Sequence, residues 1–147
     1  MNAEEPIILM IEDNPDDAEL TGIALDRIDM LEKTLWIADG ALAMDFFMGQ
    51  GDYNSPTRLS QLKMVFLDLK LPKLNGFEVL ERLRRMEAFQ HLPVSILSSS
   101  AVEDDFKHAM SLGANSYLVK PIDFKAQALY IRKAVEFWTT VHLSFDK

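Results

Sequence analysis

The chain has 147 residues, 48% of them hydrophobic and 26% charged, a composition typical of a single globular domain with a full core. Its formal net charge of −8 argues against binding to nucleic acids or anionic membranes, because both need a positively charged surface. The absence of cysteine excludes disulfides and thiolate metal sites, and the absence of a signal segment or long apolar run indicates a cytoplasmic protein.

The first predicted elements are a strand and a helix joined by an acidic turn. The apolar run Ile7–Ile11 predicts a buried strand, which ends at the acidic pair Glu12–Asp13. The dipeptide Asn14–Pro15 supplies a candidate N-cap and a residue suited to the first helical position. Asp16 and Asp17 fall in the first helical turn, where the helix dipole favours carboxylates, so we interpret them as helix-start residues. In the alternative, they extend the acidic pocket.

A second strand and helix follow. The segment Thr34–Ala38 predicts the strand, Asp39–Gly40 a turn, and the apolar spacing from Ala43 to Phe47 a short helix. From Gly49 to Gln61 the residues are mostly polar or helix-breaking, which is typical of a surface loop. This predicted loop is longer than most loops in compact domains.

The stretch Met64–Asp68 is the centre of the predicted sheet. It is an apolar run that ends abruptly in a carboxylate, which predicts a strand buried on both faces with Asp68 at its C-terminal end. Open α/β sheets bind ligands at this end of their strands. A loop over Leu69–Gly76 and a helix over Phe77–Arg85 are expected next. We interpret a small basic cluster in that helix as a solvated face: Arg82, Arg84 and Arg85.

Two more strands complete the alternation of strands and helices. Pro93–Leu97 predicts a fourth strand that ends at Ser98, and Ser116–Val119 a fifth that leads into Lys120–Pro121. The helices after them are expected at about residues 102–112 and 123–141. This alternation indicates right-handed crossovers and an α/β fold: a five-stranded parallel, doubly wound sheet with helices on both faces.

The carboxyl ends of parallel strands meet at one edge of the sheet. That edge therefore gathers an acidic, hydroxyl and ammonium set from four strands: Glu12, Asp13, Asp68, Ser98 and Lys120. Carboxylates packed closely repel one another and raise one another's pKa unless a cation neutralises them. Hard oxygen ligands suit Mg²⁺, so the residues predict a magnesium site.

These residues, in this order and spacing, closely resemble the receiver domain of response regulators in bacterial two-component signal transduction. The resemblance covers about residues 6–142 and includes the whole segment Asp68–Gly76. The long loop over residues 49–61 and the Phe137–Trp138 pair are similar to single-domain regulators typified by the response regulator of cyanobacterial phytochrome. The resemblance implies a flavodoxin-like receiver fold, with residues 1–147 as one domain and no output domain.

The resemblance also implies how the acidic residues act. Asp68 would be the phosphoacceptor, whose carboxylate attacks a phosphohistidine on a sensor histidine kinase, here a phytochrome-like one. Asp13, Asp68 and the backbone carbonyl of Lys70 would bind Mg²⁺ as cofactor. Glu12 would hold a water molecule bound to the metal.

The remaining site residues would bind the phosphoryl group and report its arrival. By the same resemblance, Lys120 would pair with one phosphoryl oxygen and the Ser98 hydroxyl would donate a hydrogen bond to another. Tyr117 would then turn inward as that hydroxyl moves, which makes it a candidate switch residue. The resemblance further implies a cis peptide between Lys120 and Pro121.

A signalling switch is the function that the resemblance implies. The phosphorylated chain would control a protein partner or pass the phosphoryl group along a phosphorelay. Because it would catalyse only its own phosphorylation and slow dephosphorylation, its standing as an enzyme depends on definition.

Two alternatives remain from other functional classes. One is a phosphate-independent interaction domain with the acidic site as scaffold, against which the intact Asp13, Asp68, Ser98 and Lys120 argue. The other is a haloacid-dehalogenase-type phosphatase, which needs an aspartate at position 70, where this chain has Lys70.

The last predicted helix is more apolar than a one-face surface helix requires. Between Ala126 and Phe145 its apolar residues spread around more than one helical stripe. We hypothesise a symmetric homodimer through this helix and the fifth strand. In the alternative, these side chains only cover the core of the monomer.

Overall fold

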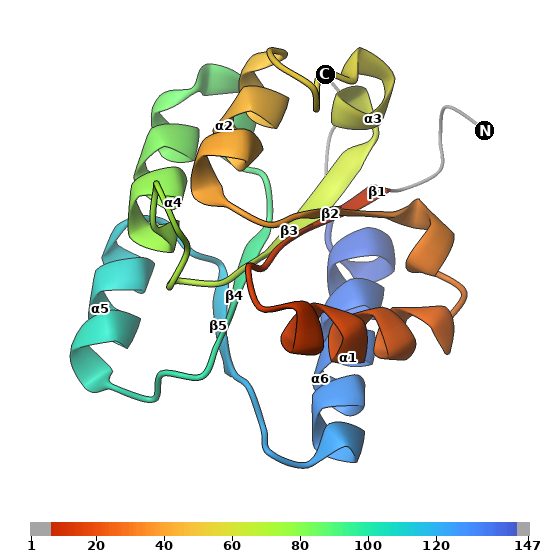
Figure 1. Ribbon diagram of the computed structural model, residues 1–147. Coiled ribbons are helices and arrows are strands. Elements are labelled where there is room, and N and C mark those ends of the chain that lie inside the picture. The colour runs from red at the N-terminus through yellow and green to blue at the C-terminus, as the bar shows by residue number, and fades with distance from the viewer. Residues whose placement is uncertain (1–6, 144–147) are drawn as a thin grey trace.

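The computed structural model describes residues 7–143, which form three layers with a parallel sheet in the middle (Figure 1). The strands lie in the order β2-β1-β3-β4-β5. Their bounds are β1 Ile7–Ile11, β2 Thr34–Ile37, β3 Leu62–Leu67, β4 Val94–Ser98 and β5 Ser116–Val119. The predicted five-stranded, doubly wound sheet is confirmed.

Helices cover both faces of this sheet (Figure 1). On one face lie α1 (Pro15–Asp26) and α6 (Phe124–Glu136). On the other lie α2 (Gly40–Met48), α4 (Gly76–Arg85) and α5 (Glu103–Ser111). Short 3-10 turns are present at Leu31–Lys33 and Glu87–Phe89. No helix in the described range is long and apolar enough to cross a membrane.

The central strands are apolar because both of their faces are covered. All residues of β1 and β4 are buried, as are the last four of β3. Alternate side chains point to opposite faces, so Leu9 of β1 packs in the cluster beneath α2 and α4, and Ile8 in the cluster beneath α1 and α6. Leu67 of β3 pairs with Ile11 of β1, which brings the ends of these two strands side by side.

Four details differ from what the sequence predicted. The loop over residues 49–61 contains a short helix, α3 (Pro56–Ser60), and β3 begins at Leu62. The last helix changes into a π-helical turn at Phe137–Val141. The Thr139 and Thr140 hydroxyls around this turn donate to the carbonyls four residues earlier, bonds that bend helices. The bond between Lys120 and Pro121 is trans, so the expected cis peptide is wrong.

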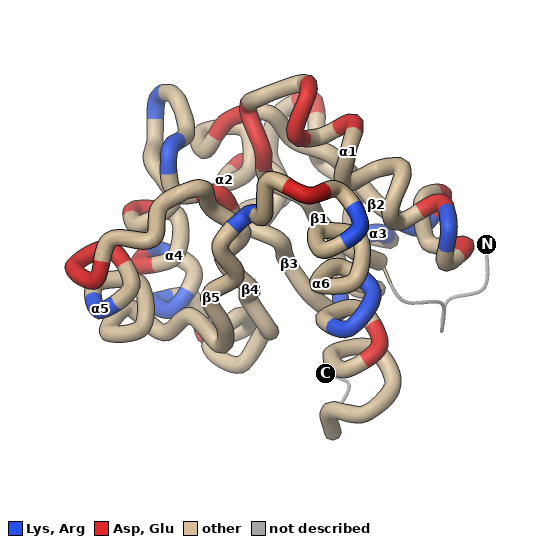
Figure 2. Tube along the Cα trace, turned by 90° about the horizontal axis from the view of Figure 1, so that it is seen from below, with Lys and Arg blue, Asp and Glu red and all other residues tan. Residues whose placement is uncertain are grey.

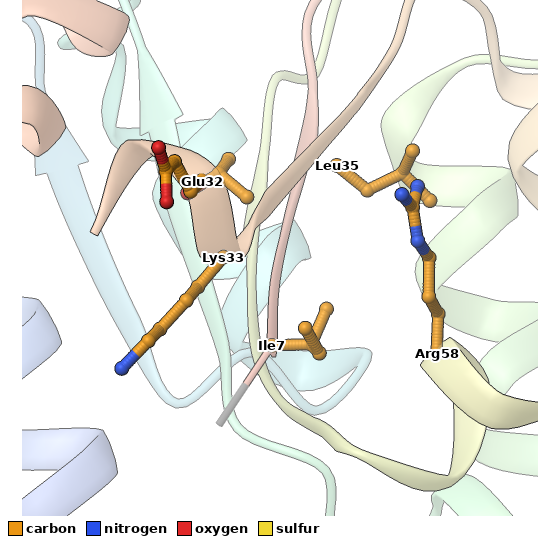
Figure 3. Close-up of a pocket in the computed structure, with 6 residues that line it drawn as sticks. Ile7, Glu32, Lys33, Leu35 and Arg58 are labelled. Carbon is orange, nitrogen blue, oxygen red and sulfur yellow. The ribbon is translucent and has the colours of Figure 1, made fainter. Parts of the chain in front are cut away.

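A small cavity lies at the end of the sheet where β1 and β2 begin (Figure 3). It measures about 30 Å³, room for about two water molecules, and is lined by Ile7, Lys33, Leu35 and Arg58 among others. The cavity is small and lies at the opposite end of the strands from their carboxyl ends, so it is not the predicted site.

Arg84 ties the end of α4 to the turns before β4 and β5. Its Nη1 donates to the carbonyls of Phe89 at 2.7 Å and Leu92 at 2.9 Å. Its Nε and Nη2 donate to the Gly113 carbonyl at 3.1 and 2.7 Å, and Nη2 also to Oδ1 of Asn115 at 2.9 Å. The interpretation of Arg84 as part of a solvated face is therefore wrong.

We predict that Arg84→Lys lowers the free energy of unfolding by about 2–4 kcal/mol, because an ammonium cannot reproduce the fork of the guanidinium. Urea unfolding followed by circular dichroism measures this change. The control is Arg85→Lys, whose guanidinium forms an exposed pair with Glu81 at 2.7 Å. That control should change stability by less than about 0.5 kcal/mol, and equal losses in the two variants would contradict the prediction.

Candidate functional site

The carboxyl ends of three strands bring a buried ammonium against carboxylates. Glu12 follows β1, Asp68 follows β3 and Lys120 follows β5. The Lys120 Nζ lies 2.6 Å from Glu12 Oε1 and 3.1 Å from Asp68 Oδ2. Only 8% of the Lys120 side chain is exposed, so these ion pairs are shielded from water. Viewed toward this edge, acidic positions gather near the start of α1 (Figure 2).

Asp17 is a third partner of the same ammonium. Its Oδ2 lies 2.9 Å from the Lys120 Nζ, so each N–H of the ammonium has one carboxylate. The interpretation of Asp17 as only a helix-start residue is therefore wrong. The backbone N–H groups of Asp16 and Asp17 both donate to Oδ1 of Asn14, which confirms that residue as the N-cap.

Three carboxylates at this edge could hold a metal ion. Oxygen atoms of Glu12, Asp13 and Asp68 lie within 4.8 Å of one another, with Asp13 exposed and the other two buried. Hard divalent cations accept such oxygen sets and keep water on the open side. The Lys70 N–H donates to Asp68 Oδ1 at 3.3 Å, which helps to orient that carboxylate. The role of the Lys70 carbonyl stays a prediction.

The burial of these charges shifts their pKa values. Burial raises the pKa of Glu12 to about 7; the neighbouring Asp68 adds to this rise and Lys120 opposes it. Burial alone would lower the pKa of Lys120, but hydrogen bonds to Glu12 and Asp17 and the charge of Asp68 raise it above its usual range. Lys120 therefore stays charged at neutral pH, whereas Glu12 is only partly ionised.

Ser98 and Tyr117 are connected through the backbone of Ser100. The Ser98 Oγ, which is buried at the end of β4, accepts from the Ser100 N–H at 3.1 Å. The Tyr117 hydroxyl donates to the Ser100 carbonyl at 2.9 Å, and its ring packs edge-on against Phe106. The backbone N–H of Lys120 donates to the Ser98 carbonyl at 2.7 Å. The backbone of Ser100 therefore contacts both the Ser98 hydroxyl near the site and the Tyr117 hydroxyl of β5.

Trp36 is a contact of the site that the sequence did not reveal. Its Nε1 donates to the Glu12 carbonyl at 2.7 Å from the edge strand β2. Nothing in the local sequence distinguishes it from an ordinary strand aromatic. Asp17 had a usable signal, because it lies in the first turn of α1, directly after the acidic pair Glu12–Asp13 that ends β1.

Comparison with known proteins identifies the family of this chain. The response regulator receiver domain matches residues 8–132. The chain belongs to this family. The receiver is 37% identical to the probable methanogenesis regulatory protein FilR2 of Methanothrix harundinacea over 140 residues, 94% of this chain and 87% of that protein. It is 31% identical to the response regulator Rcp1 of Synechocystis over 132 residues, 90% and 88% of the two chains.

Solved structures agree with the sequence relatives. The phosphorylated cyanobacterial phytochrome response regulator RcpA superposes with a TM-score of 0.85 and 29% identity, covering 95% of this receiver and 97% of that chain. The Mn²⁺-bound form of Rcp1 has a TM-score of 0.82 and 31% identity, covering 95% and 99%. The predicted resemblance to the phytochrome response regulators is confirmed.

The raised pKa of Glu12 predicts a pH-dependent stability in the absence of metal. Because its pKa is about 7 in the folded chain against 4.5 for an ordinary glutamate, its protonated form stabilises the fold. This contribution is complete below pH 4.5 and is lost as the pH rises through about 7. The free energy of unfolding of Glu12→Gln, relative to that of the native chain, should therefore rise by up to about 3 kcal/mol between about pH 5 and pH 8.

Urea unfolding in chelator at the two pH values measures this gain. The control is Glu19→Gln, an exposed acid of α1, which should track the native chain at both pH values. A difference between Glu12→Gln and native that stays constant with pH would contradict the prediction.

Proposed function

We propose that this receiver accepts a phosphoryl group on Asp68 from a sensor histidine kinase, with Mg²⁺ as cofactor. One observation carries the proposal: the carboxylate of Asp68 belongs to a three-carboxylate cluster and also contacts the buried ammonium of Lys120 at 3.1 Å. The cluster suits a divalent cation, and the ammonium suits an arriving phosphoryl oxygen. Residues 1–147 work in this proposal as one domain in the cytoplasm.

The chemistry proposed for Asp68 is an in-line transfer. A carboxylate oxygen of Asp68 attacks the phosphorus of the phosphohistidine, the bond from phosphorus to nitrogen breaks, and an acyl phosphate forms. Bound Mg²⁺, held by Asp13, Asp68 and the Lys70 carbonyl with Glu12 on its water, would offset the charge that develops. Lys120 pairs with one phosphoryl oxygen, and Ser98 donates to another.

The proposed switch runs through Ser100. When the Ser98 hydroxyl turns to the phosphoryl group, it ceases to accept from the Ser100 N–H, and the segment that also binds the Tyr117 hydroxyl is released. Tyr117 can then change its orientation, as a population shift between two states. Aromatic NMR signals of Tyr117 that are equal with and without phosphate would remove this role.

The proposed partners are a phytochrome-like kinase and a downstream protein or phosphotransfer protein. Similarity to a structure described as a phytochrome response regulator supports this kinase class. The alternative, a phosphate-independent interaction domain, would leave the buried Lys120 and its three carboxylates without a chemical role.

We predict that the native chain gains one acid-stable, base-labile phosphoryl group when it is incubated with acetyl phosphate and Mg²⁺. Asp68→Asn should gain none, because the uncharged amide is a much weaker nucleophile than the carboxylate. Intact-mass spectrometry measures the gain, and a metal-free incubation is the control. No gain by the native chain would favour the phosphate-independent interaction domain.

The surface of α6 and its π-helical turn supports the proposed homodimer in part. Ile131 and Val135 are buried and the Trp138 Nε1 donates to Ser95 Oγ at 3.1 Å, so these residues cover the core. Others of the same segment are exposed: Leu129, Tyr130, Phe137, Val141 and Leu143. Phe145 lies outside the described residues. We propose this exposed group, together with the edge strand β5, as the surface for a second copy.

We predict that Val141→Asp weakens self-association by at least about tenfold, because it places a charge within this apolar surface. Sedimentation velocity over a concentration series measures the change, with and without phosphorylation. The matched control is Val102→Asp, an exposed valine before α5. A native chain that is monomeric at high concentration in both states would contradict the homodimer.

A further inference from the structure

Among the three carboxylates on Lys120, Asp17 alone stands outside both the metal cluster and the phosphoacceptor position. Glu12 and Asp68 contribute oxygen atoms to the candidate metal cluster, and Asp68 is also the proposed phosphoacceptor. Asp17 contacts the ammonium at 2.9 Å but belongs to neither group. Its carboxylate is therefore the partner that can remain when the others change.

The fold holds Asp17 at a fixed place beside Lys120. Asp17 is the third residue of α1, and the Asn14 cap fixes that first turn. Helix α1 packs on α6, the helix that follows Lys120, and a buried hydrogen bond at 3.4 Å joins Gln127 Nε2 to Thr21 Oγ1. The two sides of the Asp17–Lys120 pair thus belong to elements that pack on each other.

A divalent cation and the Lys120 ammonium compete for the same carboxylates. Glu12 and Asp68 now bind the ammonium at 2.6 and 3.1 Å, and a cation bound by these groups would repel it. Asp17 attracts the ammonium toward α1, which weakens its hold on Glu12 and Asp68. When a phosphoryl group replaces the free carboxylate of Asp68, Asp17 still keeps the ammonium within reach of it.

We propose that Asp17 is a positioning residue for Lys120: it holds the ammonium on the α1 side of the site, so that Glu12 and Asp68 are available to the candidate metal cluster. This inference rests on the proposed function and assigns it an additional residue. Removing the Asp17 charge lets Lys120 bind Glu12 and Asp68 more tightly, so metal affinity falls.

The test measures Mg²⁺ binding by titration calorimetry, which needs no phosphorylation. Asp17→Asn should raise the Kd for Mg²⁺ by about three- to tenfold, and Asp17→Glu, which keeps the charge, should recover part of that loss. The matched control is Asp16→Asn, which removes the same charge from the same helical turn but lies exposed. It should change the Kd by less than about twofold.

A second pair of variants separates positioning from the simple loss of a charge. In a Lys120→Gln background there is no ammonium to position, so Asp17→Asn should raise the Kd no more than Asp16→Asn does. The proposal is overturned if Asp17→Asn and Asp16→Asn behave alike in the native background, or if the Asp17 effect survives in Lys120→Gln.

The failure of this proposal can be told from failure of the proposed function. A native chain that binds Mg²⁺ and gains a phosphoryl group, while Asp17→Asn equals Asp16→Asn, overturns only the role of Asp17. A native chain that neither binds Mg²⁺ nor gains a phosphoryl group overturns both.

Discussion

A buried ammonium shared by carboxylates is the interaction on which the functional edge of this fold depends. Lys120 is 108 residues from Glu12 and 52 from Asp68 along the chain, so only the parallel sheet brings them into contact. Without that cation, buried carboxylates would face one another and repel. Burial still raises the pKa of Glu12 to about 7, so the edge retains unfavourable electrostatics that a bound divalent cation would relieve. A bound divalent cation would therefore stabilise these buried carboxylates.

The sheet and the site could be predicted because their signals lie in short apolar runs that end in polar residues. Each central strand is buried on both faces, which leaves a continuous apolar segment, and parallel crossovers then place Glu12, Asp68 and Lys120 at one edge. The contact of Asp17 with Lys120 was not predicted, because the helix dipole already explains an acid in the first turn. The hydrogen bonds of Arg84 were not predicted, because they are made to backbone carbonyls of turns whose positions depend on tertiary packing.

The π-helical turn and α3 could not be predicted for a different reason. Hydrophobic periodicity finds long elements, whereas α3 has five residues inside a polar segment. At the π-helical turn the Thr139 and Thr140 hydroxyls donate to backbone carbonyls, and hydrophobic spacing does not reveal such bonds. The bond before Pro121 is trans, where the resemblance implied the cis isomer.

The same edge is connected to both faces of the sheet by separate contacts. Lys120 reaches α1 through Asp17, and α1 packs on α6, the helix proposed to carry the dimer surface. Ser98 reaches Tyr117 through the Ser100 backbone, on the side of the sheet where Phe106 of α5 packs on that ring. A phosphoryl group on Asp68 would act on Lys120 and Ser98 together, because each donates to it. The geometry would therefore allow one chemical event to bias two surfaces, with the Asp17–Lys120 pair as the contact on the α1 side.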